Sequence, residues 1–349
     1  MAFERRTPVS VVVVNWNRRN LLRACLQSLT NQTVEGFEVI LVDNGSEDGS
    51  ADMASREFGA GTAFDLKLIR NRDNRGFCAA NNQGITASGR RYVALLNNDA
   101  EAEPGWLEAL TRVFDKGSDI GMAASKILVY DDPARIDKVG HLIYLDGQNR
   151  GRGAGELDTG QYDREEEVLW PDGCAAMYRR AMLEQIGGFD EDLFAYADDA
   201  ELGLRARIAG WRCLYSPGAV VRHHRGATLG LGSPRRLELI ERNRVLLATK
   251  LFPWSLLWLN GVYYLARIGA GLVAAARNRG EARRYAGASG KARIALALIK
   301  GDLAALPLIP RFLRKRREIS RLRKLSPRET KALLKKYSIS LKELSEQAV

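Results

Sequence analysis

The chain has 349 residues, of which 46% are hydrophobic, so it can form the core of one large domain or of two ordinary ones. Its four cysteines have no paired spacing, which indicates neither a disulfide framework nor a zinc cluster and favours a reducing cytosol. The sequence soon enters a strand pattern with no apolar signal segment before it, so we expect a protein that is not secreted.

The net charge of +11 is unevenly distributed. From Pro234 onward there are 26 Lys and Arg against 8 Asp and Glu, which gives +18 there and leaves −7 for the first 233 residues. A glycine-rich stretch precedes Pro234, and helical patterns follow it. The sequence therefore predicts two parts, an α/β body over residues 1–232 and a basic helical region over residues 233–349.

Three short apolar runs, at residues 9–14, 37–42 and 92–96, predict buried strands. Continuous Val, Ile and Leu runs are typical of strands covered on both faces of a parallel sheet. Between the first two runs, leucines at positions 22, 26 and 29 mark one face of a crossover helix. The alternation of strand and helix predicts a doubly wound sheet.

Asparagine and aspartate follow all three runs. These residues are Asn15, Asn17, Asp43, Asn97, Asn98 and Asp99. Such residues are common in turns of any protein. At the carboxyl ends of parallel strands, however, they lie where doubly wound sheets bind ligands, and their oxygens suit a hard cation such as Mg²⁺ and a phosphate-bearing substrate.

A polar loop, Asn74-Arg75-Gly76, enters a helix of small residues. A glycine at a helix N-terminus lets backbone N–H groups approach an anion, and Arg75 could neutralise a phosphate. An ordinary asparagine-capped helix explains the same pattern.

Two further polar positions complete the candidate site. Asp198 and Asp199 open a predicted helix, where crowding can raise a carboxyl pKa and create a general base, or where aspartate is only a cap. His223 and His224 end an apolar strand and are either a surface pair or metal ligands.

In chain order, these blocks, together with Trp170-Pro171-Asp172-Gly173 and Gly187-Gly188-Phe189-Asp190, resemble family 2 glycosyltransferases. The similarity runs from Val9 to Thr228 and is greatest to the rhamnosyltransferase-like branch that builds bacterial surface polysaccharide. It implies the GT-A fold, a mixed, mainly parallel α/β sheet, followed here by the basic helical C-terminal region.

The resemblance also implies roles for individual residues. Asp43 would read the base of the donor. The other nucleotide-sugar contacts would be Asn15, Asn17, Asn74, Arg75, Gly76 and Asn98. Asp99 would be the principal metal ligand, helped by His223 and by Asn97, which replaces the first Asp of the family's Asp-x-Asp motif. The metal would be Mn²⁺ or Mg²⁺.

Asp199 matches the family's catalytic base. The acceptor and diphosphate side would include Trp170, Asp172, Gly173 and Asp198. The implied reaction is a single inverting displacement, with dTDP-L-rhamnose as the best donor and a glycan or polyprenyl-linked glycan as the acceptor.

Two other functions fit the sequence less well. A sugar nucleotidyltransferase needs a glycine-rich loop after the first strand, and residues 15–19 contain no glycine. A non-catalytic nucleotide-sugar-binding subunit is disfavoured because Asp43, Asp99, Asp199 and His223 are all present. Nucleic-acid binding is not expected, because the basic residues avoid the body that carries the motifs.

The C-terminal region contains an apolar, aromatic-rich stretch, residues 251–266, which stops at Arg267 and resumes over residues 268–276. It is slightly short for a membrane span of about 20 residues. Its tryptophans beside dense Arg and Lys favour a helix lying on an anionic membrane, although a helix packed on the body has the same pattern. The supporting basic residues are Arg311, Arg314, Lys315, Arg316 and Arg317. We therefore expect a cytoplasmic protein, peripheral on the inner membrane.

Overall fold

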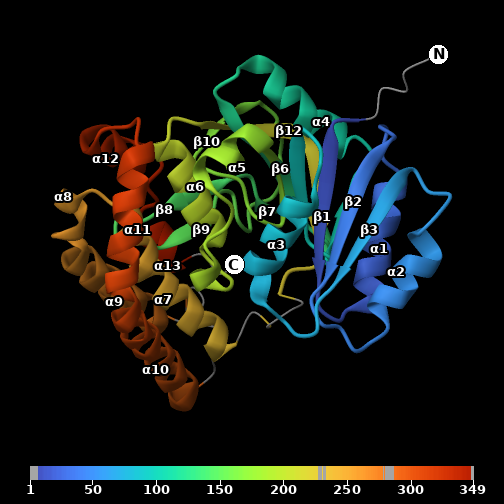
Figure 1. Cartoon of the computed structure of the whole chain (residues 1–349). Coiled ribbons are helices and arrows are strands. Elements are labelled where there is room, and N and C mark those ends of the chain that lie inside the picture. The colour runs from blue at the N-terminus through green and yellow to red at the C-terminus, as the bar shows by residue number, and fades with distance from the viewer. Residues whose placement is uncertain (1–6, 227–229, 231–232, 278, 280–286, 347–349) are drawn as a thin grey trace.

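The computed structural model describes residues 7–226, 230, 233–277, 279 and 287–346. A ten-stranded mixed sheet crosses the molecule in the order β10-β12-β6-β11-β4-β1-β2-β3, with β5 paired to β12 and β7 to β6 (Figure 1). The strands of the first half are β1 (Val9–Asn15), β2 (Phe37–Asp43), β3 (Phe64–Arg70), β4 (Tyr92–Leu96) and β5 (Ala100–Ala102). Those of the second half are β6 (Ile120–Val129), β7 (Asp132–Lys138), β10 (Glu166–Val168), β11 (Ala175–Arg179) and β12 (Arg212–His223), beside a separate pair, β8 (His141–Ile143) and β9 (Asn149–Gly151).

Strands β3, β2, β1 and β4 are mutually parallel, so their carboxyl ends meet at one edge of the sheet. Strand β11 then runs antiparallel to both of its neighbours, β4 and β6. The predicted fold class is confirmed.

Helices cover both faces of the sheet because alternate strand residues point to opposite sides. On β1, Val11 and Val13 pack in one buried cluster and Val12 packs in the other. The helices are α1 (Arg19–Thr30), α2 (Ser50–Phe58) and α4 (Trp106–Val113) on the Val11 side, and α3 (Gly76–Ala87), α5 (Arg180–Ile186) and α6 (Asp198–Ile208) on the Val12 side.

The C-terminal helices continue the Val12 side of the fold. They are α7 (Pro234–Leu251), α8 (Trp254–Leu257), α9 (Asn260–Ala276), α10 (Gly287–Ala305), α11 (Ile309–Leu322), α12 (Pro327–Lys336) and α13 (Leu341–Glu346). Leu246, Leu247 and Phe252 are buried in the same cluster as Val12, so residues on either side of the expected boundary at 232 share one core.

Helix α7 also holds the segment that leads into α6. The side-chain amide of Asn243 lies 3.0, 2.8 and 2.7 Å from the carbonyl oxygens of Leu193, Ala195 and Tyr196. Within this segment Tyr196 has a φ of 68°, a strained value for a residue with a side chain. The C-terminal region therefore supports the backbone conformation just before Asp198.

Three of the five basic residues expected to face lipid instead contact the protein. Lys315 pairs with Asp190 and Asp192, and Arg311 pairs with Asp192 at 2.7 Å. The guanidinium of Arg316 stacks on the ring of Trp254 at 4.5 Å. These contacts fasten α11 to the rest of the fold, which corrects the expectation that the whole cluster faces outward.

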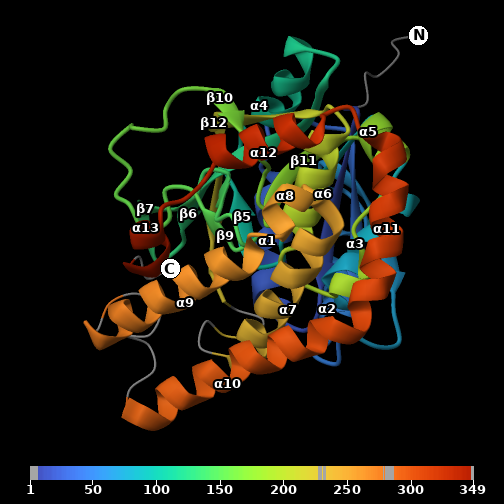
Figure 2. The same ribbon diagram turned by 90° about the vertical axis from the view of Figure 1, so that its left-hand side faces the viewer.

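The apolar stretch after α7 divides into a buried and an exposed part. Leu251, Phe252 and Leu256 are buried, whereas Ala274 is the one buried residue of α9. Helices α9 and α10 extend away from the sheet, side by side (Figure 2). Among the described residues, no helix combines the length and the apolar character that crossing a bilayer requires.

Candidate active site

A cavity of about 820 Å³ opens at the carboxyl ends of the sheet strands. Residues that follow β1, β4 and β12 form its inner wall together with the start of α6, and helices α7, α9 and α10 extend it outward. This is the edge at which the sequence places its asparagines and aspartates. The cavity is therefore the candidate active site.

The ends of β1, β2 and β4 are tied together by side-chain amides. The Asn15 amide donates to Asp43 Oδ1 at 3.2 Å, and the Asn98 amide donates to Asn15 Oδ1 at 2.7 Å. Asn17 joins this network through its backbone N–H, which donates to Ser46 Oγ at 2.8 Å. The structure thus brings together four residues expected to bind the nucleotide.

The other residues of that predicted group occupy different positions. Asn74 and Gly76 line the cavity, and Asn74 Oδ1 accepts from the N–H of Gly76 at 2.9 Å. Gly76 has a φ of 85°, and a Cβ there would lie 2.4 Å from the Phe194 ring, so only glycine fits. The Arg75 side chain is exposed and lies outside the cavity wall. Trp16, which the sequence reasoning missed, lines the cavity and is 38% exposed.

The first ionisable group at the cavity is the His223 cluster, defined as His223, Asp99 and Asp137. His223 Nδ1 lies 2.8 Å from Asp137 Oδ2, and His223 Nε2 lies 3.4 Å from Asp99 Oδ1. Burial opposes ionisation of Asp99, but the hydrogen bond and charge of His223 outweigh it and lower the pKa of this carboxyl. Asp137 was not predicted from the sequence.

The His223 cluster suits a divalent cation. Asp99 Oδ1 is buried, and its 3.4 Å contact with His223 Nε2 is not a well-formed hydrogen bond, so the oxygen is under-satisfied, which is costly unless another group contacts it. Asn97 lines the same cavity. A carboxylate on the far nitrogen of a histidine is the usual arrangement around a metal-binding imidazole. The three residues predicted as metal ligands therefore lie together, and Asp137 supports them.

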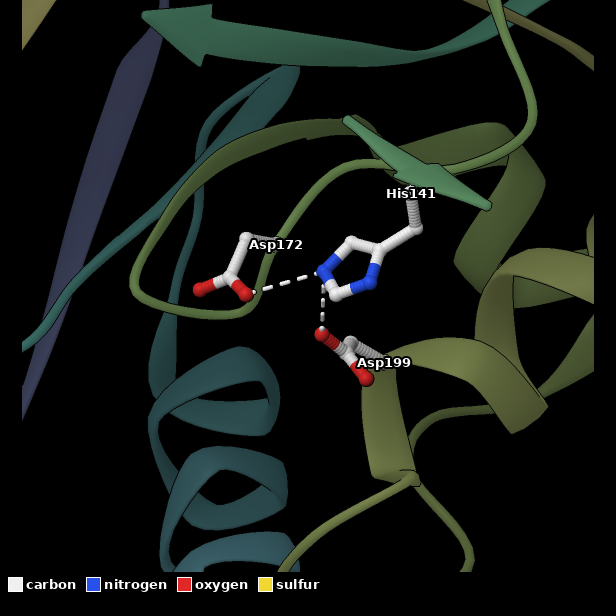
Figure 3. A group of neighbouring side chains, drawn as sticks. All are labelled: His141, Asp172 and Asp199. Carbon is white, nitrogen blue, oxygen red and sulfur yellow. Dashed lines mark hydrogen bonds and ion pairs between the residues drawn. The ribbon is translucent and has the colours of Figure 1, made fainter. Parts of the chain in front are cut away.

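The second group is the His141 cluster, defined as His141, Asp172 and Asp199 (Figure 3). One nitrogen of His141, Nε2, lies 2.9 Å from Asp172 Oδ2 and 3.3 Å from Asp199 Oδ2. Burial disfavours a charged imidazole, but Asp199 and Asp172 outweigh it and raise the pKa of His141 to about 9. At neutral pH this histidine is a cation.

Lys138 adds a second cation to the His141 cluster, because its ammonium group lies 2.7 Å from Asp172 Oδ2. Three ligand-type atoms of this cluster lie within 4.8 Å of one another, a spacing that also fits a metal ion. The imidazolium and the ammonium already balance the two carboxylates, however. Charge does not separate the two clusters, because the pKa of His223 is also raised well above its ordinary value and Arg225 Nε lies 3.2 Å from Asp137 Oδ1. What distinguishes the His223 cluster is its two buried carboxylate oxygens without a well-formed hydrogen bond, Asp99 Oδ1 and Asp137 Oδ1.

Asp198 and Asp199 are adjacent in sequence but differ in environment. Burial and the charge of Asp199 raise the pKa of Asp198 to about 8, so Asp198 is largely protonated at neutral pH. Asp199 accepts hydrogen bonds from the N–H groups of Gly173 at 3.4 Å and Ala200 at 2.7 Å. It also contacts Nε2 of His141. Asp199 is thus the carboxylate held in place at the cavity.

The indole of Trp170 does not reach the cavity. It is fully buried, and its ring lies 5.9 Å from that of His141 in a stacked arrangement. The sequence placed Trp170 on the acceptor side, whereas the structure places it behind His141. Its position supports the histidine and leaves Asp172 and Gly173 on the cavity wall.

The fold and the site together define a GT-A glycosyltransferase. A solved structure of GalNAc-T7 with UDP, GalNAc and Mn²⁺ aligns with 76% of this chain and 51% of its own, with a TM-score of 0.60 and 15% identity. A mannosyltransferase from Pyrobaculum calidifontis, in complex with GDP-Man and Mn²⁺, aligns with 91% of this chain and 86% of its own, with a TM-score of 0.55 and 18% identity. At these identities the similarity shows the fold.

The sequence gives the family. A model described as glycosyl transferase family 2 matches residues 10–187, about half of the chain, and the chain belongs to this family. A Mycobacterium tuberculosis N-acetylglucosaminyl-diphospho-decaprenol L-rhamnosyltransferase is 28% identical over 63% of this chain and 77% of its own length. An uncharacterised Sinorhizobium fredii protein is 30% identical over 64% of this chain, which spans a quarter of that protein. A Haloferax volcanii glycosyltransferase, AglE, is 37% identical over 62% of this chain and 66% of its own length.

Proposed function

We propose that this protein is an inverting, metal-dependent glycosyltransferase that moves a sugar from a nucleotide-diphosphate donor to an acceptor hydroxyl. The observation that carries the proposal is the presence of two histidine–carboxylate clusters on one cavity wall, one suited to a cation and the other to a fixed base. Family membership and the GT-A fold support it. Sugar nucleotidyl transfer is disfavoured because no glycine-rich loop follows β1.

In this proposal Asp99, Asn97 and His223 hold Mn²⁺ or Mg²⁺, and Asp137 fixes the tautomer and orientation of His223. The bound metal would neutralise the negative charge that develops on the departing diphosphate. Asp43, Asn15 and Asn17 bind the nucleotide at the strand ends. Trp16 offers an exposed ring beside them for stacking on a base.

Asp199 acts as the general base and takes the proton of the acceptor hydroxyl as its oxygen attacks the anomeric carbon. His141 positions this carboxylate from one side, and the N–H of Ala200 positions it from the other. Asp198 in its protonated form donates a hydrogen bond, and Asp172 with Gly173 forms the wall between acceptor and diphosphate. The acceptor oxygen would attack the anomeric carbon directly, opposite the departing diphosphate, and no nucleophile of the protein is required. A single displacement of this kind inverts the anomeric configuration.

For the substrates we infer L-rhamnose from dTDP-L-rhamnose and a polyprenyl-linked glycan acceptor, in the biosynthesis of cell-surface polysaccharide. The name of the Mycobacterium tuberculosis relative supports both choices, since it describes a rhamnosyltransferase acting on a decaprenol-linked sugar. The sequence motifs of the rhamnosyltransferase-like branch support the donor. A test of donor specificity compares dTDP-L-rhamnose with other nucleotide sugars.

We further infer that the protein lies on the cytoplasmic face of the inner membrane through its C-terminal region. Of the fourteen exposed large hydrophobic side chains in the described residues, eleven lie between Trp254 and Leu306. Trp258 is 84% exposed, and Leu265 is 68% exposed. Exposed apolar surface of this extent, rimmed by arginine and lysine, favours contact with an anionic lipid surface.

Nucleotide release by the purified protein tests the proposal, with dTDP-, UDP- and GDP-sugars and with Mn²⁺ or Mg²⁺. We expect turnover of one donor, its loss with EDTA, and a steep fall in Asp199→Asn. Nucleotide binding without turnover of any donor, even with a polyprenyl-linked acceptor added, would instead support a non-catalytic binding subunit.

A further inference from the structure

The cavity changes chemical character along its length. Near the sheet its wall is polar, with Asp199, His223 and their neighbours. Farther out it passes Arg244 and Arg267, and it then runs between α9 and α10, where the lining side chains are aliphatic. The outer lining residues include Ile268, Leu272, Ile294, Leu298 and Ile299.

Both walls of this outer section are apolar helices that reach beyond the body of the protein (Figure 2). On α9, Ile268 and Leu272 are one helical turn apart and both line the cavity. On α10, Leu298 and Ile299 line it from the opposite side. Aliphatic residues facing each other across an open space leave hydrocarbon surface exposed to water, which is unfavourable unless a ligand covers it.

A glycine of α9 faces the space between the two helices. Gly271 lines the cavity, and a Cβ at this position would meet no atom within 4 Å. A Cβ at Gly269, two residues away, would also meet nothing, but Gly269 does not line the cavity. A glycine in the middle of a helix destabilises the helix, so Gly271 lowers the stability of α9 at the position where the helix lines the groove.

The cavity is polar near the sheet and aliphatic between α9 and α10, which is the order of the sugar and the hydrocarbon chain in a lipid-linked sugar. A sugar hydroxyl at Asp199 and a hydrocarbon chain beside Leu272 and Leu298 would occupy one continuous cavity. Between these two positions lie Arg244 and Arg267, whose guanidinium groups pair with Glu241, Asp302 and Asp146. Exposed side chains of the same helices that do not line the cavity, Val273 on α9 and Leu296 on α10, form the outer faces of the groove walls. A lipid acceptor could thus enter from a membrane surface with its chain still partly in the bilayer.

We propose that the groove between α9 and α10 binds the hydrocarbon chain of an isoprenoid-linked acceptor and directs its phosphate-bearing end toward Asp199. This inference rests on the proposed glycosyltransferase function, because it gives that reaction its acceptor site. It assigns different roles to two faces of each helix. The groove face holds the acceptor chain, and the outer face touches the bilayer.

Two glycine variants of the full chain form a matched test. Gly271→Phe fills the groove, whereas Gly269→Phe adds the same ring to the same helix in open space outside it. Farnesyl diphosphate is the probe, inorganic diphosphate is the head-group control, and binding is measured by calorimetry. We expect Gly271→Phe to weaken farnesyl diphosphate binding at least tenfold, Gly269→Phe to stay within twofold of the wild type, and inorganic diphosphate to bind all three proteins alike.

Equal binding of farnesyl diphosphate by Gly271→Phe and the wild type would overturn the proposal. An equal loss in both variants would overturn it too, because a general effect on α9 or on membrane contact would then explain the result. Nucleotide release is also measured on Gly269→Phe and the wild type, with and without a polyprenyl-linked acceptor, and should be the same in both proteins. If neither turns over a donor even with acceptor, the glycosyltransferase proposal fails, while the difference in farnesyl diphosphate binding between the two glycine variants still tests the groove.

Discussion

The His223 cluster and the His141 cluster each place one imidazole between two carboxylates, but they are connected differently. In the His223 cluster each ring nitrogen faces its own carboxylate, and both carboxylates keep a buried oxygen without a well-formed hydrogen bond, Asp99 Oδ1 and Asp137 Oδ1. In the His141 cluster both carboxylates contact Nε2, and the unpartnered atom is His141 Nδ1. Under-satisfied carboxylate oxygens favour a metal cation, whereas two carboxylates held by one proton donor favour the positioning of a base. Composition alone does not reveal this division of roles.

The largest effect should come from the base. Asp199→Asn should lower turnover about 10²- to 10⁴-fold, the usual contribution of a positioned general base. Asp198→Asn should lower it less than about tenfold, because Asp198 has a pKa of about 8 and an amide resembles its protonated form. Nucleotide release at pH 7 measures both. Equal losses in the two variants would remove the distinction between these carboxyl groups.

The next effect concerns metal affinity. Asp99→Asn should weaken Mn²⁺ binding at least about 100-fold, and Asp137→Asn about 10- to 100-fold, since a carboxylate behind a ligating histidine typically contributes that much. Paramagnetic resonance of free Mn²⁺ gives the affinity without any need for turnover. Asp172→Asn is the control from the other cluster. If it weakened Mn²⁺ binding as much as Asp99→Asn, the metal site would belong to the His141 cluster.

A smaller effect should appear in the dependence of stability on pH. The pKa of His141 is about 9 in the folded protein, above its unfolded value of about 6.5, so its protonation stabilises the fold below about pH 6.5. This contribution, at most about 3 kcal/mol, is lost as the pH rises toward 9. The free energy of unfolding of the wild type relative to His141→Asn should therefore decline between these pH values. Urea titrations at pH 6, 7.5 and 9 measure the decline, and a difference constant with pH would contradict the assignment.

The smallest effect is expected at His224, which follows His223 but lies outside both clusters. Its ring stacks on Tyr130 at 3.6 Å and lies 3.6 Å from Glu101. His224→Asn should change Mn²⁺ affinity less than twofold and stability by less than about 1 kcal/mol, as is usual for partly exposed pairs. A large loss of Mn²⁺ binding would extend the metal site to this residue.

The sequence predicts the strand-end residues well and the partners of the clusters poorly. Parallel strands bring their carboxyl ends to one edge, so Asp43 and Asp99 could be placed near each other from pattern alone. Asp137 and His141 belong to β7 and β8, where no motif indicates the contact, and Asp137 meets His223 across 86 residues of sequence. The one sequence signal for His141 is that the chain has only three histidines and the other two, His223 and His224, are adjacent to each other at a strand end.

Side-chain direction explains the other differences between expectation and structure. Trp170 belongs to a motif at the cavity, but its ring turns into the core behind His141. Lys315 lies in a basic run that looked suited to lipid, yet acidic residues of the body pair with it. A linear pattern gives the charge of a helix but not which of its charges find partners far away in sequence.

The contacts of Asn243 with the carbonyls of Leu193, Ala195 and Tyr196 have a practical consequence for protein engineering. A chimaera that joined residues 1–232 to a foreign tail would remove this amide and release the backbone that leads to Asp199. Such a graft should instead keep α7 with the N-terminal part and begin the foreign segment after Phe252, which follows the last turn of α7, and the foreign segment must replace the later residues of the shared core, such as Leu256 and Phe312. The useful junction for exchanging acceptor specificity thus lies about twenty residues beyond the one that the charge distribution indicates.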